Sequence, residues 1–454
     1  MTKGWTRRDF LSGLGASAGL SALGGMHLFN HPARAADDVL DPLPDRYFLV
    51  LEIYGGWDLL LSLDPRDPAV FTQDNIGQTL IQPHYSHLLT PPAAGVVVDT
   101  QLGLLGGYMD ETLAHLDKVC IVRGMSMETL AHATARRRMA TGRVPDGVEL
   151  NHTTIDVWLS AWLGKNDIIP NIAISRLSKN TNQPGYATPM RINRGAQLYP
   201  AMARETPFSV DEESAIQAFL LGQQSCASAQ ASGMKVQASS SRETIAALMQ
   251  QNLGEKFNLK SKDPEMVALR EHYTVQQNPY MATPLIAAQA IKAGLSRVVG
   301  ARLSIPSLDD HGPTWARDNG PNQRMGFNAY ARVLEDLESS PHPSGDGSWL
   351  DRTTVILTSE FSRGPLMNVA EGRDHWLMNG MILAGGDIKG GQVIGASSDV
   401  GMFPMPVDLK TGAVDLLNGH LLRPDDIWHT LFHSIGIEGD PANLKGETLK
   451  ALLK

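Results

Sequence analysis

The amino-acid sequence predicts an α/β fold built on a doubly wound, mostly parallel sheet. Short apolar runs bounded by glycine, proline or polar residues recur along most of the chain, as expected for buried parallel strands. Helical patterns lie between several of these runs, and strands that alternate with helices form parallel sheets. The length also suits one large domain of this class.

The strand candidates, in chain order, are residues 47–53, 118–122, 172–174, 298–305, 353–358 and 381–384. Helical patterns cover 156–163 and 327–337. Further on, 388–395 is typical of a hairpin turned at glycines, and 423–436 of a closing helix. Because open α/β sheets bind ligands outside the carboxyl ends of their strands, we expect the chemistry directly after the apolar runs.

A stretch of different character interrupts this alternation at about residues 208–273. It is rich in Ala, Gln and Ser, which support helices but supply few large apolar side chains. We interpret it as a helical insertion, with a weakly structured part at 227–241. The sheet and the insertion together would form one domain over residues 36–454.

The first 35 residues predict a twin-arginine export signal. Arg7 and Arg8 stand in the segment Thr-Arg-Arg-Asp-Phe-Leu, an apolar stretch follows, and Ala33-Arg34-Ala35 is a small-x-small cleavage site. Glycines dilute the apolar stretch and make it a poor permanent span, although an uncleaved N-terminal anchor is the alternative interpretation. We therefore expect a periplasmic or extracellular protein without an integral membrane span.

Charge and cysteine content narrow the possible partners. The chain has 39 basic and 48 acidic residues, and removal of residues 1–35 makes its net charge of −9 more negative. This balance argues against nucleic acid or an anionic membrane as a partner. Cys120 and Cys226 are too few for a disulfide scaffold, and the apolar run around Cys120 predicts a buried thiol.

Polar clusters stand where the predicted strands end. Their chemically capable members are Asp58, His132 followed by arginines at 136–138, Asp309 or Asp310 with His311, Glu360 with Arg363, and Asp374 with His375. Carboxylates and imidazoles in this combination suit a site for two divalent metal ions, which could be zinc, manganese, calcium or magnesium. Two such ions would hold an anionic ester during an in-line displacement.

Each cluster also has a structural interpretation. The alternatives are a strand-ending turn at Asp58, a solvated loop pair at Asp309 and His311, a surface ion pair of Glu360 with Arg363, and a solvated helix face at 136–138. Asp310 competes with Asp309 as the ligand. The pair Asp374 and His375, which follows the flexible Gly372, is hardest to explain as structure alone.

Several of these motifs together resemble one known family. The motifs are Gly-Gly-x-Asp after the first strand, Asp-x-His, Ser-Glu-Phe-x-Arg, and Gly-Arg-Asp-His-Trp followed by Ala-Gly-Gly-Asp. They are similar to the domain-of-unknown-function 1501 family, whose twin-arginine-exported members are related to the alkaline phosphatase and sulfatase superfamily. The resemblance covers nearly the whole mature chain, and the block 372–391 is its most specific part.

This resemblance implies a sheet of the alkaline phosphatase/sulfatase type with metal ligands at the strand ends. Carried onto this sequence, the ligands are Asp58, Asp309, His311, Glu360, Asp374 and His375, and we expect His132 and Arg363 to serve catalysis. The implied function is an exported metal-dependent hydrolase of phosphate or sulfate esters. The alternative is a non-catalytic binding or assembly protein that keeps the same sheet.

The sequence departs from the family's pattern next to His132. The family commonly has a Ser-His-Phe-Asp-like segment there, whereas this chain has Ala131 and Ala133 beside the histidine. The hydroxyl nucleophile of the superfamily is therefore not identified by its motif. Ser126, Thr129 and Thr134 are the hydroxyls available nearby.

Overall fold

The computed structural model describes residues 44–145, 151–202, 211–212, 215 and 253–454. The predicted export signal, Cys226 and the predicted weakly structured part at 227–241 lie outside the described residues. Within these ranges, no helix is both long and apolar enough to cross a membrane. Cys120 is fully buried, as predicted.

Eight strands form one mixed sheet in the order β12-β4-β11-β8-β1-β7-β5-β6. Their bounds are β1 Tyr47–Glu52, β4 Val119–Ser126, β5 Asn171–Ile174, β6 Met190–Ile192, β7 Val298–Arg302, β8 Thr353–Thr358, β11 Met378–Ala384 and β12 Gln392–Ile394. Neighbouring strands pair in parallel, except that β11 is antiparallel to both β4 and β8. The predicted α/β class with a mostly parallel sheet is confirmed.

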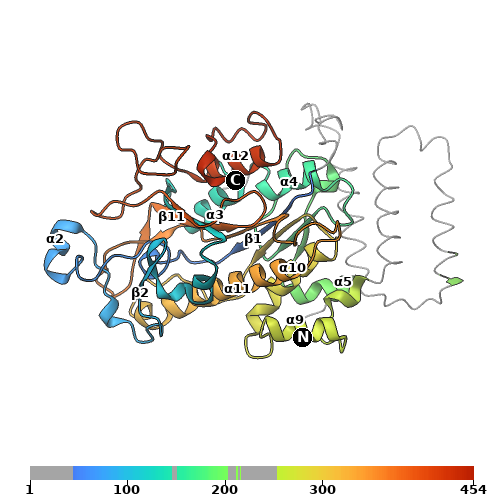
Figure 1. Ribbon diagram of the computed structural model, residues 1–454, viewed down its shortest axis with the longest axis horizontal. Coiled ribbons are helices and arrows are strands. Elements are labelled where there is room, and N and C mark those ends of the chain that lie inside the picture. Colours follow the sequence, from blue (N-terminus) through green and yellow to red (C-terminus); the bar gives the residue numbers. More distant parts are fainter. Residues whose placement is uncertain (1–43, 146–150, 203–210, 213–214, 216–252) are drawn as a thin grey trace.

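Helices cover both faces of this sheet (Figure 1). One face carries α10 (Ala282–Lys292) and α11 (Gly320–Ser339), and the other carries α3 (His132–Thr141), α4 (Ile155–Leu163) and α12 (Pro424–Ser434). Successive side chains of a strand point to opposite faces, so Leu49 and Leu51 of β1 enter one core cluster while Phe48 and Val50 enter the other.

The remaining elements are short and lie in the connections between the large ones. They are β2 (Val97–Thr100), β3 (Gly103–Gly106), β9 (Ser362–Arg363), β10 (His375–Trp376), α2 (Ile76–Thr79), α5 (Leu198–Met202) and α9 (Pro264–His272). Strands β2 and β3 pair with each other, and so do β9 and β10.

The described end of the predicted insertion packs against the main core. Phe257, Leu269 and Tyr273 are buried in the same cluster as α10 and α11. The Tyr273 hydroxyl donates to a carboxylate oxygen of Asp336 on α11 at 2.9 Å. Residues 253–273 are therefore anchored to the helical layer on that face.

The predicted hairpin at 388–395 is wrong. Strand β12 pairs in parallel with β4, with Val393 opposite Ile121, so β4 lies between β11 and β12. Gly385 and Gly386, both with positive φ, turn the chain away at the end of β11. The glycines do mark a turn, but the strand on the far side of it finds a partner distant in sequence.

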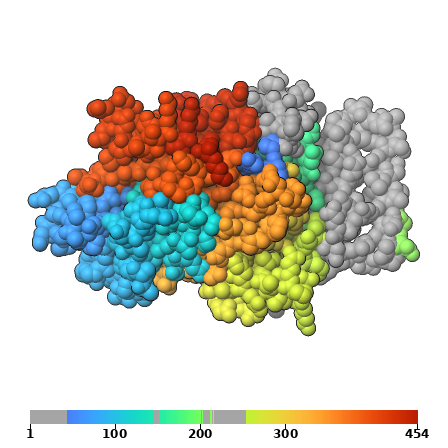
Figure 2. Space-filling model, in the orientation of Figure 1, coloured from blue at the N-terminus to red at the C-terminus, as the bar shows by residue number. Residues whose placement is uncertain are grey.

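The two ends of the described chain meet beside the sheet. In Figure 2 the red C-terminal residues lie against the dark blue first residues. Arg46 forms an ion pair with Asp387 at 2.6 Å, and the backbone N–H of Lys454 donates to the carbonyl of the same aspartate at 2.9 Å. The predicted closing helix is α12, which packs its Trp428 and Leu431 into the core on its face of the sheet.

The topology brings distant segments to one edge of the sheet. Because β11 runs against its neighbours, it begins at the edge where the parallel strands end, and β10 leads into it there. After β1 the chain turns at Gly55, whose φ is +112°. A Cβ at this position would lie 2.3 Å from the backbone nitrogen of Leu308, so glycine lets the loops after β1 and β7 touch.

Candidate metal site

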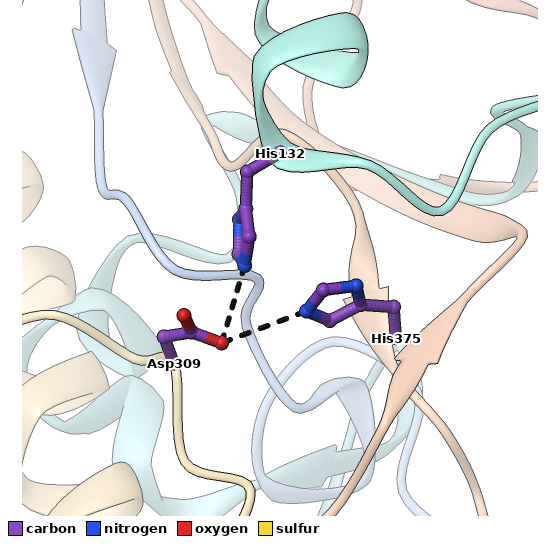
Figure 3. Close-up of side chains that lie close together, drawn as sticks. All are labelled: His132, Asp309 and His375. Atoms are coloured by element: carbon purple, nitrogen blue, oxygen red, sulfur yellow. Dashed lines mark ion pairs between the residues drawn. The ribbon is translucent and has the colours of Figure 1, made fainter.

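Three side chains from different parts of the chain meet at this edge (Figure 3). His132 begins α3, Asp309 follows β7, and His375 begins β10. Their ligand atoms all lie within 4.8 Å of one another. In the part of the chain that the structure describes, this is the one group of three or more His, Cys, Asp or Glu side chains close enough to share a metal ion.

A third imidazole, that of His311, lies beside this group. Its Nε2 is 3.1 Å from Oδ1 of Asp309 and 2.9 Å from Nε2 of His375. The Nε2 atoms of His132 and His375 lie 3.1 and 3.5 Å from the same carboxylate oxygen. Three imidazole nitrogens therefore surround one oxygen of Asp309.

The other ring nitrogen of each histidine is held by an acceptor. These acceptors are Glu360 Oε1 for His132 at 2.8 Å, Asp374 Oδ1 for His311 at 2.8 Å, and the Leu130 carbonyl for His375 at 2.5 Å. Carbonyl and ionised carboxylate oxygens only accept, so each Nδ1 carries the proton. In the neutral form of each ring, which is the form that binds metal, the lone pair of Nε2 faces Asp309.

This arrangement places acceptor atoms face to face. The buried Nε2 of His132 has no hydrogen-bond partner, because its approach to Asp309 is close enough for an ion pair but lacks hydrogen-bond geometry. The Nε2 atoms of His311 and His375 cannot bond to each other while both rings are neutral. His311 Nε2 also lies 3.1 Å from Nη1 of Arg363, which can donate to it. A cation between His132, Asp309 and His375 would satisfy the ligand atoms of these three side chains, so the donor set fits a divalent metal ion.

Arg363 ties the loops of the site together. Its side chain is fully buried, and its Nη2 lies 2.6 Å from Oδ1 of Asp309. The same guanidinium donates to the carbonyls of Gly55 and Gly56 in the loop after β1, and to that of Arg373 at 3.0 Å. These bonds place Arg363 behind Asp309, and its expected part in catalysis stays a prediction.

The electrostatics favour an ionised carboxylate at the centre. Burial by itself raises the pKa of Asp309, but the hydrogen bond and charge of Arg363, followed by those of His132, outweigh it. The pKa of Asp309 therefore lies well below its usual range. Burial, followed by the positive charge of Arg363, lowers the pKa of His375 and so favours the neutral ring that a metal requires.

Glu360 has a supporting position behind His132. Its carboxylate is buried and also accepts from the backbone N–H of Gly55 at 3.0 Å. Burial tends to raise the pKa of Glu360, but the hydrogen bond from His132 and then those from backbone N–H groups lower it overall. In return, the hydrogen bond to Glu360 is the largest of the effects that raise the pKa of His132.

Asp58 is engaged in a different interaction. Its fully buried carboxylate pairs with Nε of Arg373 at 2.8 Å and accepts from Nε1 of Trp315 at 2.8 Å. It also caps the 3-10 helix Leu59–Leu61 by accepting from the N–H of Leu60. These partners occupy both carboxylate oxygens, and Asp58 is not in the group of candidate ligands.

Apart from Asp58 and Arg363, the predicted site residues divide into three sets. Asp309 and His375 stand at the centre together with His132, which we expected to be catalytic rather than a ligand. His311 lies at the exposed rim, and Glu360 and Asp374 hold histidines from behind. The described residues bring together one group of ligands, whereas the sequence suggested two metal ions.

Several supporting groups have no signal in the sequence. The Leu130 carbonyl is a backbone atom, so no side-chain pattern marks it. Asn368 donates to Asp374 at 3.0 Å and to the carbonyl of His311 at 3.1 Å, but lies in an unremarkable loop. Asp310 turns away from the cluster and accepts from Thr314 and Asn319, which leaves Asp309 as the aspartate at the centre.

Comparison with known proteins identifies the family. The family described as "Protein of unknown function (DUF1501)" matches residues 50–430, which is most of the chain. This chain belongs to the DUF1501 family. The match confirms the resemblance seen in the motifs, and it spans every residue of the candidate site. A search of curated proteins finds no match to this DUF1501 protein.

Solved structures similar to this DUF1501 protein come from several bacteria. A phosphonate monoester hydrolase of Silicibacter pomeroyi is 11% identical, with 90% of this chain and 76% of that chain covered and a TM-score of 0.35. The lipoteichoic acid synthase LtaP of Listeria monocytogenes is 9% identical, with 96% and 82% covered and a TM-score of 0.36. An alkaline phosphatase superfamily protein of Vibrio parahaemolyticus is 8% identical, with 99% and 80% covered and a TM-score of 0.37. Similarities this loose transfer no residue role to this chain.

Proposed function

We propose that this protein is a metal-dependent hydrolase of phosphate or sulfate esters. His132, Asp309 and His375 would hold the metal, with His311 at its edge. The observation that carries the proposal is the convergence of three imidazole Nε2 atoms on one oxygen of Asp309, while all three Nδ1 atoms are held by acceptors. Metal-binding histidines are oriented by carboxylate or carbonyl acceptors in this way.

The ligand chemistry favours zinc among the four metals considered. Imidazole nitrogen suits zinc, whereas calcium and magnesium prefer sites made of oxygen ligands. Three protein ligands would leave one position of a tetrahedral zinc ion open for substrate. When bound, such an ion supplies Lewis-acid polarisation of the ester and neutralises developing negative charge.

The surrounding residues would hold this site in one arrangement. Glu360 fixes the ring of His132, and Arg363 fixes the carboxylate of Asp309. His132 also begins α3, a ten-residue helix whose first turn has no side-chain cap. Its positive end adds to the attraction for an anionic ester.

Metal analysis of the purified protein tests the proposal directly. We expect about one equivalent of divalent metal per chain, since the described ligands form one group. His132→Ala should remove this equivalent, and Glu360→Gln should weaken zinc affinity by about 10–100-fold because the ring loses its orienting carboxylate. Chromogenic phosphate and sulfate esters should be hydrolysed only without chelator. Equal zinc content in the parent protein and His132→Ala would contradict the site.

One observation favours the alternative, a non-catalytic binding or assembly protein. The hydroxyl of Thr129 accepts from the backbone of Ala131, and that of Thr134 accepts from Arg137. No hydrogen bond among the described residues joins these hydroxyls or that of Ser126 to the metal ligands. If the protein binds one equivalent of metal but hydrolyses neither ester class, the alternative is supported.

We infer that the chain is exported by the twin-arginine pathway, on the strength of its first 35 residues. Changing Arg7 and Arg8 together to Lys should leave the precursor in the cytoplasm, because the export receptor recognises the arginine pair and not its charge. Cell fractionation followed by immunoblotting measures this. Arg34→Lys, which makes the same change outside the pair, should still be exported. If the mature form of the variant with both Arg7→Lys and Arg8→Lys is found outside the cytoplasm, the assignment of a twin-arginine signal is overturned.

A further inference from the structure

Two arginines share one aromatic ring beside the metal ligands. Tyr54 follows β1, Arg302 ends β7 next to it in the sheet, and Arg136 lies one turn after His132 in α3. The guanidinium carbons of Arg136 and Arg302 lie 5.0 and 4.3 Å from the centre of the Tyr54 ring. The ring thus holds two positive charges at the edge of the sheet where the histidines converge.

These two arginines differ from the others around the site in having few acceptors. The side chain of Arg302 has no hydrogen bond or ion pair to any residue that the structure describes. Arg136 has one contact with a carboxylate, at 4.0 Å from Oε1 of Glu360, and that oxygen already accepts from His132 at 2.8 Å. The buried Arg363, by contrast, has an ion pair and several carbonyl acceptors.

The carboxylates beside the two arginines already have closer partners. Glu52, which is opposite Arg302 in the sheet, binds Nε of Arg176 at 2.7 Å. Glu360 is committed to His132 and to the backbone of Gly55. A bound oxyanion would supply the counter-charge that these carboxylates do not give to the two guanidinium groups.

We propose that Arg136 and Arg302, held by the ring of Tyr54, bind a phosphate or sulfate group of the substrate next to the metal ligands. The proposal deepens the proposed hydrolase function and rests on it for the identity of the substrate. Arginine suits this role because its planar guanidinium donates two parallel bonds to a tetrahedral oxyanion. The Tyr54 hydroxyl, which has no hydrogen bond to a described residue, is a further possible donor.

Calorimetric titration of the full protein with inorganic phosphate and, separately, inorganic sulfate tests this site without turnover. Each titration is run on metal-loaded and on chelator-treated protein. Arg302→Gln and Arg136→Gln should each weaken anion binding about tenfold, the loss expected for one charge-assisted bond. Arg317→Gln, which removes an exposed arginine paired with Asp318, should leave anion binding unchanged. The arms with phosphate and sulfate show which oxyanion the site prefers.

Variants of Tyr54 separate the ring from the hydroxyl. Tyr54→Phe keeps the ring and should retain most of the binding, whereas Tyr54→Leu should weaken it as much as loss of an arginine. Unchanged melting of each variant verifies folding, and Arg302→Lys, which keeps the charge, replaces Arg302→Gln if that variant unfolds. Arginine-dependent binding without ester hydrolysis would support this site and end the hydrolase proposal. Binding that depends on metal and not on the arginines, or no binding of either anion, would overturn it.

Discussion

Replacing His375 with alanine should lower thermal stability mainly when metal is present. His375 contributes an Nε2 to the ligand group, and a metal that binds only the folded state stabilises it by mass action. At a zinc concentration one hundred times the dissociation constant, this contribution is about 2.7 kcal/mol. Thermal melts of the parent protein and His375→Ala, each with zinc and with chelator, measure the difference.

A buried histidine outside the site provides the matched control. His342 packs against Tyr47 and Trp349, and no metal-ligand group among the described residues includes it. His342→Ala should therefore lower the melting temperature by the same amount with zinc and with chelator. If His375→Ala behaves like this control, His375 is a packing residue and the metal hypothesis fails at this position.

The strands of this fold could be predicted because they are buried on both faces. Runs such as 47–53 and 353–358 are apolar at nearly every position, which is the pattern that two covering helical layers require. The direction of β11 and the partner of β12 could not be predicted in this way. Both depend on pairing with β4, which lies more than two hundred residues earlier and contributes no local signal.

For the candidate site, too, the sequence predicts which residues lie near the sheet edge but not which distant residues their side chains contact. The motifs marked Asp309 and His375, and the structure brings both side chains close to His132, because polar residues after buried strands gather at one edge of the sheet. They could not show which way each side chain turns. Asp58 follows β1 as expected, but its carboxylate forms a buried ion pair with Arg373 and accepts a hydrogen bond from Trp315, both distant in sequence.

Exchanging Asp58 for asparagine should destabilise the protein by about 3–5 kcal/mol, equally with zinc and with chelator. Asp58 and Arg373 are both fully buried, and their ion pair is 2.8 Å long. Burial raises the pKa of Asp58 and lowers that of Arg373, so each charge depends on the other for compensation. The exchange leaves the guanidinium without its counter-charge. Urea denaturation measures the loss as a lower midpoint.

The exposed pair of Arg317 and Asp318 is the control for geometry, since its distance of 2.7 Å is similar but both partners reach solvent. Asp318→Asn should leave the urea midpoint unchanged, because solvent screens such pairs. The double variant Asp58→Asn with Arg373→Met should recover part of the loss, since it removes the uncompensated charge as well. Zinc content should stay at the parent value in every one of these variants. A loss of zinc in Asp58→Asn, with the fold intact, would instead return Asp58 to the metal site and contradict its assignment to the buried ion pair.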